Sequence, residues 1–159
     1  MPLNGKRIRT PKRNRLCSER WAIVEKQLGP DHPDVAVTLI NLGVFYKTEK
    51  RYNQAEELLR RALDINVKAL PAGHSYVEYG LFLLAGVLMD EGRFTEAETL
   101  FKQALDMRAT RPHRVEAEDA VMLEQYGNAL RLNGNSTGAD AAETHARTIR
   151  AELKYLIRP

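Results

Sequence analysis

Residues 32–65, HPDVAVTLINLGVFYKTEKRYNQAEELLRRALDI, contain two apolar stripes separated by the polar stretch KTEKR. The first stripe repeats at intervals of four, three and four residues, the spacing of one face of an α-helix, and consists of Val35, Leu39, Leu42 and Tyr46. The second stripe is also helical in its spacing and consists of Ala55, Leu58, Leu59, Ala62, Leu63 and Ile65. The stretch therefore predicts two amphipathic helices joined by a short turn.

The same pattern returns 42 residues later, in HSYVEYGLFLLAGVLMDEGRFTEAETLFKQALDM at residues 74–107. Residues 29–70 and 71–112 align without a gap and are identical at 12 positions. The register continues more weakly into residues 113–154, where the matches are Leu123, Leu130, Gly134, Ala139 and Ala146. Three units in one register predict a repeat architecture, because neither helix of a unit can bury its wide apolar face alone.

Small residues recur where the two helices of each unit would meet. Alanine stands at positions 55, 97 and 139, and again at positions 62, 104 and 146. A larger side chain there would push the paired helices apart. Gly92, in the turn DEGR, suits the left-handed backbone conformation that ends a helix.

The last predicted helix is apolar along one narrow stripe, made of Ala139, Ala142, Ala146, Ile149, Leu153 and Leu156. Glu143 and Arg147 stand where the earlier units have Leu59 or Phe101 and Leu63 or Leu105. One face of this helix is therefore expected to meet solvent, which predicts a C-terminal cap helix.

Two sets of residues resemble the tetratricopeptide repeat (TPR). They are Leu39, Leu42-Gly43, Tyr46, Tyr52, Ala55, Leu59 and Ala62, and Leu81, Leu84-Ala85, Leu88, Gly92, Phe94, Ala97, Phe101 and Ala104. The period exceeds the usual one of about 34 residues, and with EKQLGPDHPDVAVTLINLGVFY it looks like the kinesin-light-chain-like subclass. The resemblance implies an all-α fold: a right-handed superhelical solenoid of stacked antiparallel helix pairs, with about seven helices.

We expect a TPR-like domain over residues 16–154, which divides into a lone helix of a partial repeat (16–28), repeat 1 (29–70), repeat 2 (71–112) and repeat 3 with the cap helix (113–154). Residues 155–159 form a short tail. Residues 1–15 are expected to be a disordered leader with six basic residues and no acidic one. Residues 16–159 contain the other 18 basic residues and all 21 acidic ones, so their net charge is −3. This charge argues against a basic nucleic-acid-binding domain.

Catalysis, metal binding and cofactor binding have no support in the sequence. There is one cysteine, no nucleotide-binding or metalloprotease motif, and no metal-ligand spacing among the four histidines. His32 and His74 lie one period apart and are expected to pack in the turns between units. The sequence contains no run of 18 apolar residues, so it predicts no membrane span. The leader lacks the apolar stretch of a signal peptide. The expected location is therefore cytoplasmic.

In TPR proteins the first helix of each unit lines the concave face. The resemblance therefore implies partner contacts at residues off the core stripes of these helices: Asn41, Val44, Tyr79, Phe82, Met89, Gln125, Asn128 and Arg131. Asn41 matches the asparagine that binds the ligand backbone in peptide-binding members, although Leu83 and Gln125 occupy its equivalent positions.

The sequence thus predicts a non-enzymatic protein-interaction module that binds a partner peptide or helix. Two alternatives stay open. One is a nucleic-acid or anionic-membrane adaptor that acts through the basic leader, although this leader has no aromatic residue on which bases could stack. The other is a scaffold that associates with itself.

Overall fold

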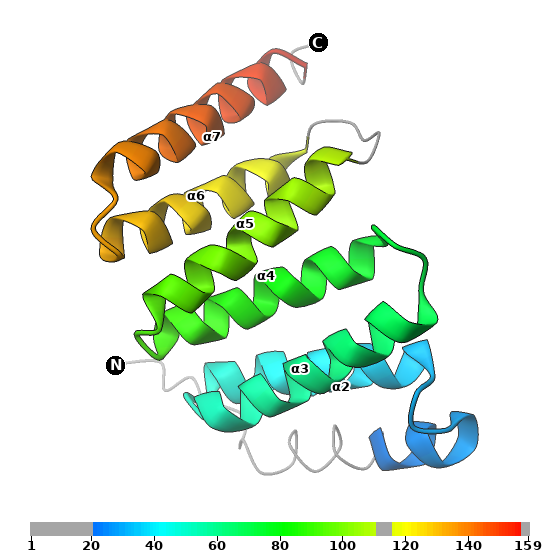
Figure 1. Cartoon of the computed structure of the whole chain (residues 1–159). Helices are drawn as coiled ribbons and strands as arrows, with labels where there is room; N and C mark the ends of the chain where they lie inside the picture. Colours follow the sequence, from blue (N-terminus) through cyan, green and yellow to red (C-terminus); the bar gives the residue numbers. More distant parts are fainter. Residues whose placement is uncertain (1–20, 111–115, 157–159) are drawn as a thin grey trace, which may run out of the picture. The chain divides into compact units, whose positions relative to one another are not determined.

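A computed structural model describes residues 21–110 and 116–156, which form seven helical segments and no strand (Figure 1). Residues 21–28 are helical, and six helices follow: α2 (Pro33–Thr48), α3 (Tyr52–Ala69), α4 (Ser75–Asp90), α5 (Phe94–Thr110), α6 (Ala117–Leu132) and α7 (Ser136–Leu156). The predicted leader and the first residues of the predicted lone helix lie outside the described residues. The chain divides into two compact units, residues 1–69 and 70–159.

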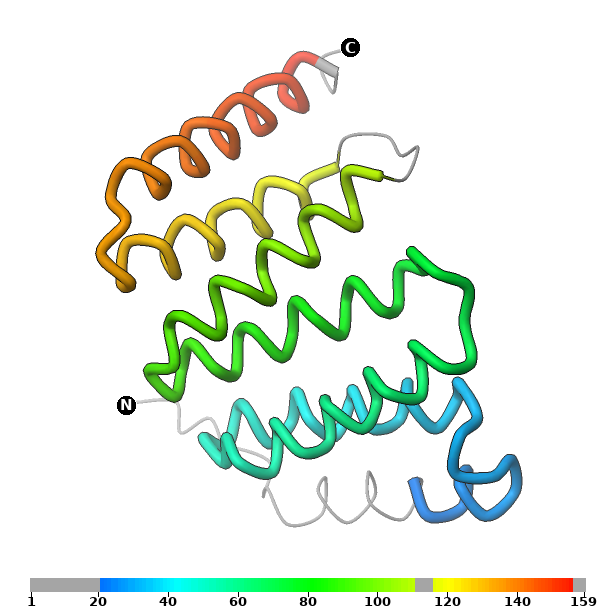
Figure 2. Tube along the Cα trace, viewed as in Figure 1, coloured from blue at the N-terminus to red at the C-terminus, as the bar shows by residue number. Residues whose placement is uncertain are grey.

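In the first unit α2 and α3 pack as an antiparallel hairpin (Figure 2). The buried apolar residues of this hairpin include Val35, Leu39 and Leu42 from α2, and Ala55, Leu59 and Ala62 from α3. The helices approach closely at Gly43, where an added Cβ would lie 2.8 Å from Cγ of Leu59. Both apolar stripes of the sequence therefore face the same core.

The second unit contains two such hairpins, α4–α5 and α6–α7, and α6 packs against α5 (Figure 2). The first hairpin buries Leu84 and Leu88 of α4 with Phe101 of α5. The second hairpin has a smaller core, in which Ala120 clusters with Ala146 and Ile149. The predicted all-α architecture of antiparallel helix pairs is confirmed.

The recurring alanines lie inside these hairpins. None of the six has any exposed surface: Ala55, Ala62, Ala97, Ala104, Ala139 and Ala146. Their burial at the same place in each hairpin explains why alanine recurs with the 42-residue period.

His32 and His74 have a structural role in the turns between units, as predicted, and they fill it as helix caps. The Nδ1 atom of His32 accepts a hydrogen bond from the backbone N–H of Asp34 at 3.1 Å, and Nδ1 of His74 accepts from Tyr76 at 3.2 Å. Each ring thereby satisfies one of the free N–H groups at the start of α2 or α4. The equivalent residue in repeat 3, Glu116, also occupies the N-cap position and forms a capping box with Asp119.

The turn within each hairpin requires one residue with a left-handed backbone. Gly92 has a φ of 80° and Gly134 has a φ of 87°, which confirms the role predicted for Gly92. Lys50 fills the equivalent position of the first hairpin with a φ of 61°. A side chain is disfavoured in this conformation, so the first hairpin carries local strain that the other two avoid.

Candidate functional site

One face of α6 is exposed at every third or fourth residue, and this face and the equivalent face of α4 carry exposed apolar side chains. Tyr79 is 49% exposed, Val121 is 39% exposed and Leu132 is 49% exposed. Tyr79 and Val121 are one period apart, so they occupy the same place on successive first helices. Exposed apolar side chains that gather on one face are typical of a surface that a partner covers.

A pocket of about 220 Å³ opens on this face between α4 and α6, and we call it the α4–α6 pocket. Its lining comes from α4, α5 and α6 and consists of Glu78, Tyr79, Phe82, Arg108, Ala117, Glu118, Val121 and Met122. Phe82 is half-buried, and its ring meets the buried ring of Phe101 edge-on at 5.6 Å between centroids. This aromatic pair fixes one wall of the pocket, while Tyr79 leaves a second ring free to contact a ligand.

A largely buried ion cluster adjoins the pocket, and two of its members, Glu78 and Arg108, belong to the pocket lining. The guanidinium of Arg108, whose side chain is 15% exposed, donates to Glu78 at 2.8 Å and contacts the carboxylate of Asp119. Glu116 lies 3.6 Å from the same guanidinium. Because Glu78 belongs to α4 and Asp119 to α6, Arg108 joins both helices to α5 and holds the pocket walls in place.

Sequence reasoning missed this cluster. One period earlier, Asn66 stands for Arg108, Ala36 for Glu78 and Val77 for Asp119, so the repeat comparison gave no signal. The one available hint was that Glu78 interrupts the first turn of an otherwise apolar helix next to Val77, a core residue.

The residues predicted for the second unit occupy different environments. Tyr79 and Phe82 line the pocket. Gln125 and Asn128 are exposed on α6, on the same face as Val121 and at helical spacing from it. Met89 is half-buried near the end of α4 and does not line the pocket.

Arg131 was expected to contact a partner, but its guanidinium lies against α7. It donates to Asp140 at 3.0 Å and to Glu143 at 2.6 Å. These two hydrogen bonds link the ends of the last hairpin across its turn. The charge of Arg131 is thus already balanced by two carboxylates, and this residue does not line the pocket.

In the first unit the two predicted residues lie on α2. Asn41 is exposed and Val44 is half-buried, three residues further along the helix. They hold the positions that Leu83 and Gly86 hold in α4. Val37, one turn before Asn41, is also exposed, so this face of α2 combines apolar side chains with one amide.

Metal-binding clusters and membrane-spanning helices are both absent from the described part of the chain. Within residues 21–110 and 116–156, no three side chains of His, Cys, Asp or Glu gather in a way that would hold a metal ion. In the same ranges, none of the helices combines the length and the apolar character that crossing a membrane requires.

Comparison with known proteins supports the repeat assignment. Family models described as tetratricopeptide repeat match residues 22–66 and residues 81–115. A search of curated protein sequences found no match.

Solved structures share the fold at low sequence identity. BtubC (BKLC) from P. vanneervenii superposes with a TM-score of 0.84 at 18% identity, over 90% of this chain and 57% of BtubC. A second structure is that of a putative kinesin light chain of Podosopora anserina with nearly identical TPR-like repeats. It superposes with a TM-score of 0.72 at 22% identity, over 89% of this chain and 67% of the Podosopora anserina chain. A point variant of the same Podosopora anserina protein superposes with a TM-score of 0.75 at 23% identity, over 91% of this chain and 68% of the variant. This chain therefore spans little more than half the length of BtubC.

These likenesses confirm the predicted TPR-like solenoid fold, and TPR units generally serve as non-catalytic modules for protein–protein interaction. The two family matches cover α2 with α3 and α4 with α5, the hairpins whose residues suggested the resemblance. The chain belongs to the tetratricopeptide-repeat family.

Proposed function

We propose that this chain is a non-enzymatic interaction module that binds a peptide or helix of a partner protein on the first helices of its repeats. The observation that carries the proposal is the α4–α6 pocket with its exposed apolar rim, Tyr79 and Val121. A partner's apolar side chain would enter the pocket against Phe82 and Met122. Affinity would come from burying these apolar surfaces, and most of it from a few central residues.

Polar residues beside the pocket would orient the ligand. Gln125 and Asn128 continue along α6 from Val121, and a side-chain amide can both donate to and accept from a peptide backbone. In the first unit, Asn41 would bind the partner in the same way, with Val44 as its apolar neighbour. We leave Arg131 out of this set because two carboxylates of α7 already engage it.

The experiment first selects a ligand from displayed random peptides on the full chain and then measures its affinity for variants by calorimetry. The Tyr79→Ala/Val121→Ala double variant removes both rim residues and leaves the buried Phe101 in place. We expect it to weaken binding by about 2 kcal/mol, or about 30-fold.

The matched control is Tyr155→Ala, which removes a 75% exposed tyrosine from α7 in the same unit. It should leave the affinity unchanged. Unchanged binding by the rim variant, or equal losses in both variants, would overturn the proposed pocket, provided that circular dichroism shows full helicity.

A further inference from the structure

The second unit has another cleft, which is lined by residues of α5, α6 and α7. It encloses about 390 Å³, and we call it the α5–α7 cleft. Its lining consists of Leu105, Asp106, Arg108, Ala109, Asp119, Leu123, His145, Thr148, Ile149 and Glu152. Arg108 is the one residue that this lining shares with the α4–α6 pocket, so the two sites can be tested separately.

The first unit shows what fills the equivalent position two periods earlier. Arg61 of α3 corresponds to His145, and it reaches the helical stretch 21–28. Its guanidinium carbon lies 5.5 Å from the centre of the Trp21 ring, and the guanidinium also contacts the carboxylate of Glu25. An arginine side chain thus bridges successive second helices there, with an aromatic ring and a carboxylate as its partners.

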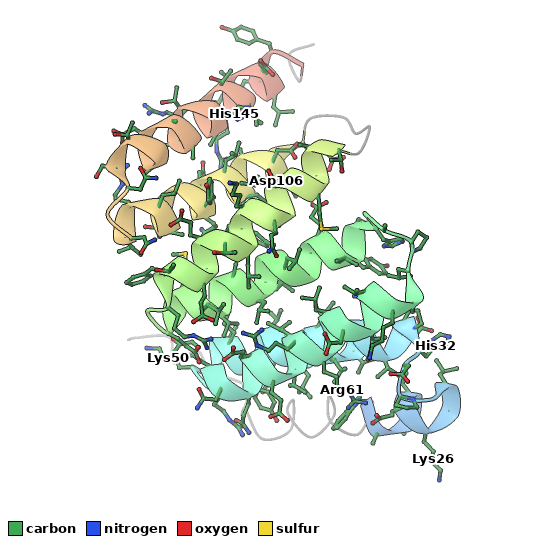
Figure 3. All side chains as sticks on the ribbon, viewed as in Figure 1. Lys26, His32, Lys50, Arg61, Asp106 and His145 are labelled. Carbon is green, nitrogen blue, oxygen red and sulfur yellow. The ribbon has the colours of Figure 1, made fainter. Side chains whose placement is uncertain are left out.

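The second unit lacks each of these three groups. Leu105 replaces Trp21, Ala109 replaces Glu25, and the shorter His145 replaces Arg61. Figure 3 labels His145 on α7 and Asp106 on α5, and both residues line the cleft. The space that Arg61 occupies in the first unit is therefore open between α5 and α7.

The charges around this open space are mainly negative. The lining contains three carboxylates, from Asp106, Asp119 and Glu152, and one guanidinium, from Arg108. Asp119 and Arg108 are already paired with each other. Asp106 and Glu152 are exposed, one on each wall, and neither forms an ion pair with another described residue. Burial, and then the charges of Glu98 and Asp106, raise the pKa of Tyr126 on α6.

We propose that the α5–α7 cleft is a second docking site, which takes an arginine side chain from a partner protein. The arginine stem would lie on Leu105 and Ile149, and the guanidinium would pair with Asp106 and Glu152. Arginine suits this cleft because its planar head binds carboxylates through two parallel hydrogen bonds while its stem covers apolar surface. The bound arginine would thereby take the place that Arg61 takes in the first unit.

The test titrates the full chain with the peptide acetyl-Leu-Ala-Arg-Ala-Leu-amide and follows backbone amide resonances by NMR. We expect shifts at Asp106, His145 and Glu152. A twin peptide with citrulline, which has nearly the same shape and no charge, should bind about tenfold more weakly. Equal binding of the two peptides would overturn the proposal, as would shifts confined to Tyr79 and Val121.

Two variants locate the site. Asp106→Asn with Glu152→Gln removes the charges from both walls and should weaken arginine-peptide binding about tenfold. Ala109→Glu with His145→Arg rebuilds the ion pair of the first unit and should abolish binding, without lowering the urea midpoint of unfolding. Glu118→Gln, which alters a carboxylate of the α4–α6 pocket, is the matched control and should leave binding unchanged.

Deletion of residues 1–15 decides between a partner's arginine and the chain's own. The proposal expects the same affinity for the arginine peptide before and after deletion. Tighter binding after deletion would overturn the assignment to a partner, because the basic leader would then be the occupant that competes with the peptide.

Discussion

The two hairpins of the second unit have the same backbone plan, but one face of each differs in chemistry. α4–α5 carries Phe82, Phe101 and Leu105 at the positions where α6–α7 carries Glu124, Glu143 and Arg147. The hairpin with apolar residues is packed against α6, and Phe101 is buried. Its counterpart Glu143 is only half-buried, and Arg147 is exposed. At these three positions the α4–α5 hairpin is therefore apolar and more buried, whereas the α6–α7 hairpin is charged and more exposed.

Exposed ion pairs link the two helices of the α6–α7 hairpin. Arg150 of α7 donates to both carboxylate oxygens of Glu124 of α6, at 2.7 and 2.8 Å, and this hydrogen bonding lowers the pKa of Glu124. Such exposed pairs orient the helices but contribute little to stability. We propose on this basis that α7 is a cap helix, as the sequence predicted.

The largest expected effect comes from Phe101→Ala, which removes a buried ring that packs against Phe82 inside the α4–α5 hairpin. We expect the free energy of unfolding to fall by about 3–5 kcal/mol, because a large buried side chain is lost and a cavity remains. The matched variant Glu143→Ala should lower it by less than about 1 kcal/mol. Urea denaturation followed by circular dichroism measures both, and equal losses would contradict the contrast between the hairpins.

The second-largest expected loss in the free energy of unfolding comes from Arg108→Ala. Removing this guanidinium leaves the buried carboxylates of Glu78 and Asp119 without their main partner, which should cost about 3 kcal/mol. Arg150→Ala breaks the exposed pair with Glu124 and should cost less than about 1 kcal/mol. If the loss comes from unpaired charge, adding Glu78→Gln and Asp119→Asn to Arg108→Ala should restore part of the stability. Failure of this rescue would indicate that packing, and not charge, explains the loss.

The glycines at the hairpin crossings give a smaller contrast. Gly43→Ala would place Cβ 2.8 Å from Cγ of Leu59, whereas Gly127→Ala places it no closer than 3.3 Å from Ala139 and Glu143. Alanine gains about 1 kcal/mol of helix propensity in both cases. We expect a net loss of about 1 kcal/mol for Gly43→Ala, because overpacking exceeds this gain. Gly127→Ala should be nearly neutral in thermal unfolding, and a similar loss there would show that the last hairpin is packed as tightly as the first.

The smallest expected effect is a gain. Lys50→Gly relieves the left-handed strain of the first turn and should raise the free energy of unfolding by about 0.5–1 kcal/mol. Gly92→Ala introduces the same strain in the second hairpin and should lower it by about 1 kcal/mol. Differential scanning calorimetry of both variants would show shifts of opposite sign, and a loss for Lys50→Gly would mean that the lysine makes contacts that offset its backbone strain.

Much of the fold was predictable because it depends on local spacing. The apolar stripes through Leu39 and Leu84 predicted which side chains are buried. The alanines at positions 55, 97 and 139 predicted where the two helices of each pair come into contact. Tyr79 was correctly predicted to be exposed from its position between core residues. The histidine caps were missed because His32 and His74 look like core or turn residues in sequence, and only the ring orientation shows the hydrogen bond to the backbone.

The sequence by itself determined the period, the helix pairs and the chemistry of each helix face, because these follow from residues a few positions apart. Only the tertiary structure decided which distant side chains meet. Arg108 joins Glu78 and Asp119 from three different helices, and Arg131 turns to Asp140 and Glu143 rather than to the α4–α6 pocket. Charged side chains are long and flexible, so their partners depend on how helices pack in space and cannot be read from helical spacing.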